Sequence, residues 1–420
     1  MARPAPIRLA GMIVATATFA ALATEASAQA TPACDPQAGE ACSSTQTQTG
    51  DVTGLVDIDM SVDQVTVSNS AQGNALAGGV TAASAGLVSR QTMTGATVAR
   101  SNVVVNGEAD GQLSVQTTAR GNYLAVTTDR ATFAVDATQS STGDQVRAGT
   151  YVQVPGGRVL QGGFATSAAV ANTVAMGGPS SSLTGVIDQT AQTTVFAETV
   201  ADVQYIPAPA TFSSQAVANA VQTNTTGASH QDLAIRQSNG ASTTEARTDV
   251  YVDNAWDLTV GANAGANQAI TANAGGSMLI ATDQTNAGRV RADARVQTNL
   301  QGQTVLAARS VANETVAGNN DIYLKLDNTQ LNSGGVEANA TYVGVNGYDA
   351  YVGADAVGNA VTGYACTQCG GGDVNITNNQ TNSGNVTATT SATVASGRTA
   401  VVGANAVGNT ATFYVSRPGG

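Results

Sequence analysis

The sequence has few of the residues that build a thick hydrophobic core. Only 4% of its 420 residues are aromatic, 11% are charged, and there is a single tryptophan. Small and β-branched residues pack better into a core that is one or two side chains thick, and they favour strands over helices. The composition therefore disfavours the two or three thick globular domains that the length alone would allow.

Basic residues are scarce as well. The chain has 17 Lys and Arg against 29 Asp and Glu, which gives a net charge of −12, and Lys325 is its only lysine. Nucleic acids and anionic lipid surfaces are bound through clustered Lys and Arg. We therefore expect neither as a partner.

Residues typical of catalysis do not gather in the sequence. His230 is the only histidine and has no recurring partner, and carboxylates are scattered singly. No phosphate-binding loop or Ser-His-Asp set is present. The GGGD at residues 370–373 stands alone, without the iterated motif of calcium-binding repeats. We predict no enzyme activity, no metal site and no cofactor.

The four cysteines form two local pairs, Cys34 with Cys42 and Cys366 with Cys369. In an exported protein such pairs are typical of disulfides. A Cys-x-x-Cys motif can also serve zinc binding or redox chemistry. Zinc needs four ligands, and a redox thiol usually lies at a helix N-terminus. We therefore predict two disulfides, the second on an inserted loop.

The N-terminus indicates export. Residues 1–28 carry two arginines, then an apolar run at 9–22 that is too short to span a bilayer, and an Ala-Ser-Ala cleavage site at 26–28. Cys34 lacks the preceding apolar residue of a lipoprotein signal. The rest of the chain is divided into an N-terminal segment (29–45), a repeat region (46–416) and a C-terminal tail (417–420).

The repeat region carries a glutamine mark that recurs in the form Gln-x-x-x-Gly before a β-rich stretch. The spacings between successive glutamines are 48, 50, 48, 47, 46 and 50 residues, and a weaker first copy lies at Gln46. The seven clear positions are Gln91, Gln139, Gln189, Gln237, Gln284, Gln330 and Gln380.

A second mark, Ala-x-(Gly/Ala)-Asn or a close variant, keeps phase with the first over eight units. Each asparagine precedes the next glutamine by 17 or 18 residues, except in the last unit, where the interval is 21. Two independent marks in phase predict a repeat architecture. The asparagines are Asn74, Asn122, Asn172, Asn219, Asn267, Asn313, Asn359 and Asn409.

Within a unit, apolar and polar residues alternate with period two, as half-buried strands require. In the sixth unit the residues expected to face the core are Val290, Ala292, Ala294, Val296, Thr298 and Leu300. A short strand at residues 322–326 follows. Each unit is thus predicted to hold about four short strands.

One such unit buries too little apolar surface to be stable alone, so the units are expected to stack. We predict an all-β fold, an elongated β-solenoid (β-helix) of about eight repeats of 48 residues. Two coils of ~24 residues per repeat suit four short strands; one coil per repeat is the alternative. The recurrent Gln and Asn would then form structural ladders, each side-chain amide bonding its equivalent in the next unit.

The signal peptide, the acidic Ala/Thr/Val/Asn/Gly composition and the iterated QTNSGNV (380–386) and NAVGNTA (405–411) units resemble the holdfast-anchor (HfaD) family of stalked bacteria. The repeats are also similar in style to curlins. The resemblance implies an exported adhesin at the cell surface, associated with the outer membrane. Its implied partners are the holdfast polysaccharide, a curlin-like anchor protein and an outer-membrane lipoprotein secretion pore.

Two other function classes remain open. The first is an ice- or carbohydrate-binding solenoid, for which Thr387, Thr389 and Thr393 offer a flat threonine face and Trp256 a stacking ring. The equivalent positions of the sixth unit are Arg and Asp, so this face is not regular. The second is a β-helix enzyme that degrades polysaccharides, which would require a repeated Asp/Arg/Tyr cluster.

Overall fold

The computed structural model describes residues 41–240, 243–366 and 373–416, all of them within one compact unit, Pro32–Gly420. The prediction of an all-β fold is confirmed, because these residues form strands and no helix. The strands are β1 (Cys42–Gln48), β2 (Val52–Met60), β3 (Val65–Thr81), β4 (Ser84–Met93), β5 (Thr97–Val105), β6 (Glu108–Ala109), β7 (Leu113–Asp129), β8 (Thr132–Ser141), β9 (Gln145–Val159), β10 (Gly163–Pro179), β11 (Ser182–Ala191), β12 (Thr194–Ile206), β13 (Ala210–Thr226), β14 (His230–Asn239), β15 (Thr243–Ala274), β16 (Ser277–Asn286), β17 (Arg289–Asn319), β18 (Tyr323–Asn332), β19 (Val336–Cys366), β20 (Asp373–Asn382), β21 (Val386–Ser396) and β22 (Thr399–Ser416).

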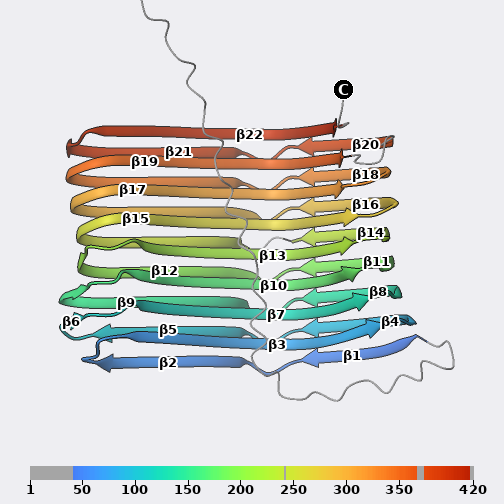
Figure 1. Ribbon diagram of the computed structural model, residues 1–420, viewed down its shortest axis with the longest axis horizontal. Helices are drawn as coiled ribbons and strands as arrows, with labels where there is room; N and C mark the ends of the chain where they lie inside the picture. Colours follow the sequence, from blue (N-terminus) through green and yellow to red (C-terminus); the bar gives the residue numbers. More distant parts are fainter. Residues whose placement is uncertain (1–40, 241–242, 367–372, 417–420) are drawn as a thin grey trace, which may run out of the picture. The chain divides into compact units, whose positions relative to one another are not determined.

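The strands form two parallel sheets. One has eight strands, in the order β1-β4-β8-β11-β14-β16-β18-β20, and we call it the small sheet. The large sheet contains a short series (β2, β5, β9, β12) and a long series (β3, β7, β10, β13), and β15 runs through both. The strands of each series lie one above another (Figure 1).

The chain visits the small sheet, the short series and the long series in turn. β4, β5 and β7 follow one another, and β8 then pairs with β4 in the small sheet. We call one such circuit a coil. In three coils of the C-terminal half the last two strands merge, so that β15, β17 and β19 each have 31 or 32 residues; in the last coil β21 and β22 stay separate.

Each repeat forms one coil, so the prediction of two coils per repeat is wrong. Gln91 pairs directly with Gln139, and Asn74 with Asn122, the next copy of each mark. Two coils per repeat would have paired each Gln with a residue about half a repeat away. Most coils hold two or three strands, because the strands are longer than the sequence pattern suggested; the coil of β4 to β7 holds four, one of them the two-residue strand β6.

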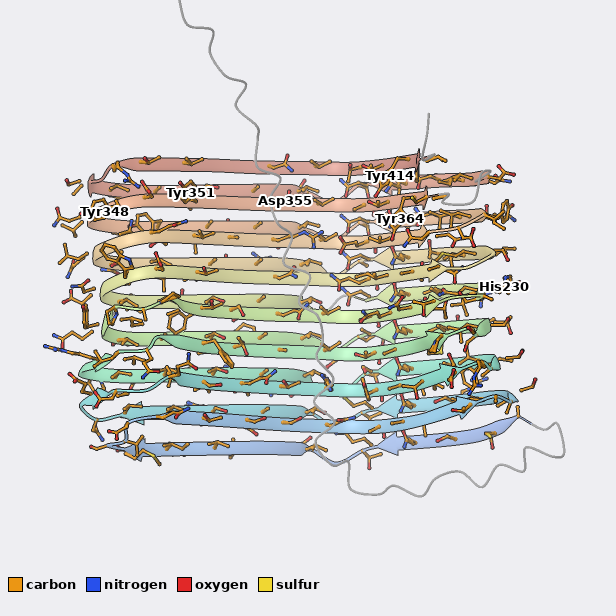
Figure 2. All side chains as sticks on the ribbon, viewed as in Figure 1. His230, Tyr348, Tyr351, Asp355, Tyr364 and Tyr414 are labelled. Atoms are coloured by element: carbon orange, nitrogen blue, oxygen red, sulfur yellow. The ribbon has the colours of Figure 1, made fainter. Side chains whose placement is uncertain are left out.

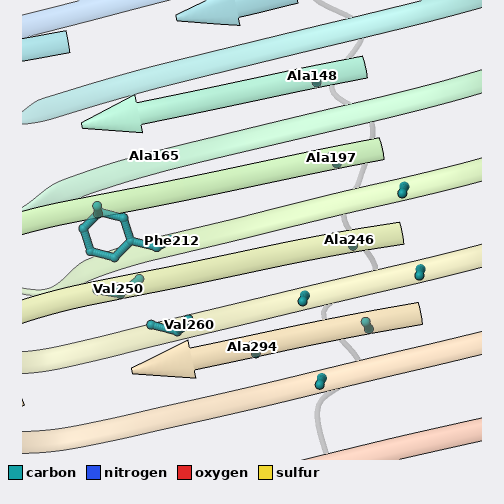
Figure 3. Close-up of a cluster of buried hydrophobic side chains, with 14 of the residues drawn as sticks. Ala148, Ala165, Ala197, Phe212, Ala246, Val250, Val260 and Ala294 are labelled. Atoms are coloured by element: carbon teal, nitrogen blue, oxygen red, sulfur yellow. The ribbon is translucent and has the colours of Figure 1, made fainter. Parts of the chain in front are cut away.

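The core is thin and built from small residues, as the composition indicated. One cluster of buried residues lies between the short and long series, and a second between the small sheet and the rest of the long series. Figure 3 shows a column of alanines at equivalent strand positions, Ala148, Ala197 and Ala246, and, further along the strands, the ring of Phe212. Alanines let the two layers approach, and the occasional large side chain fills the remaining space.

The predicted inward set of the sixth unit is confirmed for five of its six members. Val290, Ala292, Ala294, Val296 and Thr298 are all at most 2% exposed. Leu300 is 47% exposed, because the alternation ends where β17 bends towards the long series. In the short strand predicted at residues 322–326, Leu324 and Leu326 are buried as expected, but Ile322, expected on the same inner face, precedes β18 and is 52% exposed.

Several sequence predictions fall outside the described residues, namely the signal peptide (1–28), the tail (417–420), Cys34 and Cys369. Cys366, at the end of β19, has a free thiol, which does not support the predicted Cys366–Cys369 disulfide. Among the described residues there is no helix long and apolar enough to cross a membrane.

Candidate functional site

The glutamine marks lie in one column of the small sheet and are joined by hydrogen bonds. From Gln91 to Gln380, each side-chain Nε2 donates to the Oε1 of the equivalent glutamine in the preceding coil, at 2.7 to 2.8 Å, and Gln46 is the acceptor for Gln91. Each Nε2 also donates to a main-chain carbonyl of the long series, such as Gln284 Nε2 to Glu314 O at 3.0 Å. This column therefore links coils to one another and the small sheet to the long series.

The asparagine marks form a second column, in the middle of the long series. Each Nδ2 from Asn74 to Asn359 donates to the Oδ1 of the asparagine in the following coil, at 2.7 to 2.9 Å. The same Nδ2 donates to the main-chain carbonyl of the residue after the ladder glutamine, as Asn267 does to Thr285 O at 2.9 Å. The constant interval of 17 or 18 residues reflects this second contact.

The two ladders run in opposite directions. The asparagine amides donate towards the C-terminal end of the stack, as Asn267 does to Asn313, and the glutamine amides donate towards its N-terminal end, as Gln284 does to Gln237. Asn122 and Asn313 are fully buried, and an unpaired buried amide would cost about 1–3 kcal/mol. The ladders thus require each coil to carry the same residue in the same register.

The residue before each ladder asparagine is small because both positions face the core. Ala171 and Asn172 are consecutive and both fully buried, so the strand reverses its inward and outward alternation at this point. Ala312 and Asn313 repeat the arrangement. Two adjacent inward side chains fit only when one of them is small.

Sequence reasoning missed two further polar columns. Asn239, Asn286, Asn332 and Asn382 form a short ladder with bonds of 2.7 to 2.8 Å. The repeated Gln-x-Asn in the last four units was a usable signal for it. Buried hydroxyls also bridge the short and long series of the N-terminal half, through Ser101, Thr117, Thr150, Ser167, Thr199, Ser214 and Thr248. The isolated Ser and Thr residues showed no pattern in the sequence that would have predicted this set.

The outer face of the short series carries paired charges. Glu198 lies between Arg147 and Arg247, at 3.4 and 3.8 Å, and Arg247 also contacts Asp249 at 2.5 Å. Asn339 and Arg289 donate hydrogen bonds to Glu337 and lower the pKa of its carboxyl. Most of these groups are partly exposed, so each pair adds little to stability.

A groove opens where the short series turns towards the long series. It has a volume of about 340 Å³ and is lined by parts of β9, β12, β15 and β17, including Asp202, Tyr251, Asp253, Gln297 and Asn299. Neither ladder mark contributes to it. The groove is polar and carries one aromatic ring.

His230 does not belong to a catalytic arrangement. It lies at the start of β14, at the edge of the molecule, and its Nδ1 is 2.6 Å from Ser277 Oγ (Figure 2). In the described ranges no three His, Cys, Asp or Glu side chains lie close enough to hold a metal ion.

Parallel, in-register coils joined by amide ladders define a repeat protein of the stacked β type. The family model of holdfast attachment protein D matches residues 59–335, so the chain belongs to this family. The resemblance drawn from the repeat units is therefore confirmed. No curated protein and no solved structure matches the chain.

Proposed function

We propose that this chain is an exported structural adhesin that attaches the holdfast polysaccharide to the cell envelope. It acts at the cell surface, in association with the outer membrane, as an elongated β-solenoid of eight repeats, 46–416. The family match supports attachment, and the uninterrupted glutamine ladder from Gln46 to Gln380 supports a mechanical role. Force applied to one coil is shared by in-register strands and buried amide bonds of the next.

The last coil is a candidate contact with the rest of the anchor. It is formed by β20, β21 and β22, and the outermost strand edges of a sheet can accept an added strand. Its exposed apolar residues are Val401, Val402, Phe413, Tyr414 and Val415. We propose that a curlin-like partner docks here, and that a lipoprotein secretion pore in the outer membrane completes the attachment.

Deleting the gene tests this function. The mutant should still make holdfast but shed it, which lectin staining of the cells and of the medium would reveal. Expression of the full chain should restore attachment. Cells that keep their holdfast without this protein would refute the proposed function.

The alternative of a carbohydrate-binding solenoid keeps one specific observation in its favour, the polar groove with Tyr251 on its wall. This alternative is compatible with anchoring if the sugar bound is the holdfast itself. The regular threonine face that an ice-binding protein needs is absent from the described short series, because its outer positions carry residues such as Arg247 and Asp293.

A further inference from the structure

The groove is built from residues at equivalent positions of successive coils. Asp202 pairs in register with Tyr251, and Tyr251 with Gln297, so these three side chains form one outward row. Asp253 and Asn299 form the next row, in which Asn299 Nδ2 donates to Asp253 Oδ1. Four coils contribute to the groove, so it extends over three coil steps, ~14 Å. This length suits a short stretch of a linear chain.

A bulge in β9 hollows out one end of the groove. Val154 pairs with Val203 and Arg158 with Tyr205, so β9 has three residues where β12 has one. The extra residues include Pro155 and Gly156, which line the groove. The bulge carries the backbone of this coil away from the regular stack, and the neighbouring coils leave a concave surface.

An exposed aromatic pair lies at the turn that follows the groove. Trp256, three residues after Asp253, is 57% exposed, and Tyr348 is 53% exposed. Their ring centroids are 6.1 Å apart with an edge-to-face geometry. Gly302 occupies the coil between them, and a Cβ there would come within 3.1 Å of the indole ring. Figure 2 shows Tyr348 at the outer edge of the stack.

The carboxylates of the groove differ from Glu198 and Asp249, which also lie on the short series. Glu198 and Asp249 are within 4 Å of arginines. Asp202 and Asp253 are exposed and form no ion pair with any described residue. Their charges therefore remain available to a ligand, and they repel an anionic one.

We propose that this groove and the aromatic pair Trp256–Tyr348 bind a polysaccharide chain that lacks acidic groups. Carboxylate and amide oxygens accept hydrogen bonds from sugar hydroxyls or amines, and the amide nitrogens of Gln297 and Asn299 donate to ring and hydroxyl oxygens. The apolar face of a pyranose ring packs on Trp256, since Arg295 already lies over the Tyr251 ring, 5.8 Å from its centroid. The inference rests on the proposed attachment function and assigns the sugar contact to this site.

The chain's single tryptophan makes a direct test possible, since its fluorescence reports only on position 256. The purified mature chain is titrated with three hexasaccharides that share a β-1,4-glucan backbone: cellohexaose, its 2-amino form, and its C6-carboxylate form. The neutral and amine chains should give saturable changes in fluorescence. The acidic chain should bind at least about tenfold more weakly. Equal or tighter binding of the acidic chain, or no binding of any, would overturn the proposal.

Two variants assign the binding to these residues. The double variant Asp202→Asn/Asp253→Asn should weaken binding of the amine chain about tenfold and reduce its preference over the acidic chain. Tyr348→Ala should weaken all binding while it keeps Trp256 as the reporter. Asp283→Asn and Tyr323→Ala make the same changes on the small sheet and should leave affinity unchanged. Unchanged affinity in both groove variants would contradict the assignment.

A cell assay separates this inference from the proposed function. The gene-deletion strain is complemented with the wild-type chain, the groove variants or the small-sheet variants. Shedding of holdfast by the groove variants alone supports the site. If the deletion strain sheds holdfast and the groove variants hold it as firmly as the wild type, the groove proposal fails and the attachment function stands.

Discussion

The Nδ2 of Asn313 donates a 2.8 Å hydrogen bond to the Oδ1 of Asn359, the residue at the same position one coil later. Asn313 Nδ2 also donates to Leu331 O at 2.9 Å, so one amide joins two coils and two sheets. Both asparagines are fully buried. Water therefore cannot replace the hydrogen bonds that these two side chains make.

Replacing a ladder asparagine should destabilise the fold. Asn313→Leu removes the acceptor of Asn267 and the donor to Asn359 and to Leu331 O, and should cost about 1–3 kcal/mol for each buried group left unpaired. Chemical denaturation of the purified chain measures the loss. Asn320→Leu changes an exposed asparagine nearby and should be close to neutral. Equal, negligible effects of the two substitutions would contradict a structural role of the ladder.

Two adjacent glycines should respond differently to alanine. A Cβ at Gly334 would lie 2.0 Å from the carbonyl oxygen of Gly288 in the preceding coil, whereas a Cβ at Gly335 would meet nothing within 4 Å. Gly334→Ala should therefore separate the stacked turns and lower the thermal midpoint. Gly335→Ala should be neutral or stabilising by up to about 1 kcal/mol. The reverse order would show that the turns do not stack closely.

Alkaline pH should weaken the fold through Tyr342. The side chain is 1% exposed, and burial raises its pKa to about 12. The unfolded chain releases the same proton near pH 10, so the stabilisation is complete below pH 10 and is lost as the pH rises to about 12. Unfolding experiments at pH 8 and at pH 11.5 should differ more for the wild type than for Tyr342→Phe, by about 2 kcal/mol. If the free energy of unfolding changed by the same amount between the two pH values in both proteins, Tyr342 would not be the cause of the alkaline destabilisation.

Removal of one whole coil should preserve the stack. Deleting residues 284–329 joins Asp283 to Gln330, which places Gln330 above Gln237 and Asn359 above Asn267. Since each coil contacts only its neighbours, strand-rich circular dichroism and export should survive. A deletion of 20 residues from the same start disrupts the register and should abolish folding. If only the shorter deletion is tolerated, the stacked-coil architecture is wrong.

Blocking the last coil should impair attachment more than losing an internal one. Proline and lysine introduced within residues 410–415 of β22 remove main-chain donors and place charge at an open strand edge. The altered chain should fold, reach the surface and fail to retain holdfast, as lectin staining would show. Full retention of holdfast would argue against docking at this edge.

The sequence by itself determined the repeat, its phase, the strand character and the identity of the two ladder columns. These features follow from periodicity, because a residue that must bond its own copy in the next coil has to recur at a fixed interval. The short asparagine ladder that was missed follows the same rule, because its residues recur as Gln-x-Asn in the last four units, from Gln237 onwards.

Only the tertiary structure decided how many coils a repeat makes. The bends of the chain at its Gly-rich turns determine which strands pair, and the alternation of apolar and polar residues does not predict where the chain bends. It also decided that Leu300 is exposed and that Thr117 and Thr150 are bonded to each other across the core. The groove likewise could not be predicted from the sequence. Asp202, Tyr251 and Gln297 follow one another at intervals of 49 and 46 residues and do not recur; in-register pairing of β12, β15 and β17 brings them together, and the bulge in β9 hollows out the stack beside them.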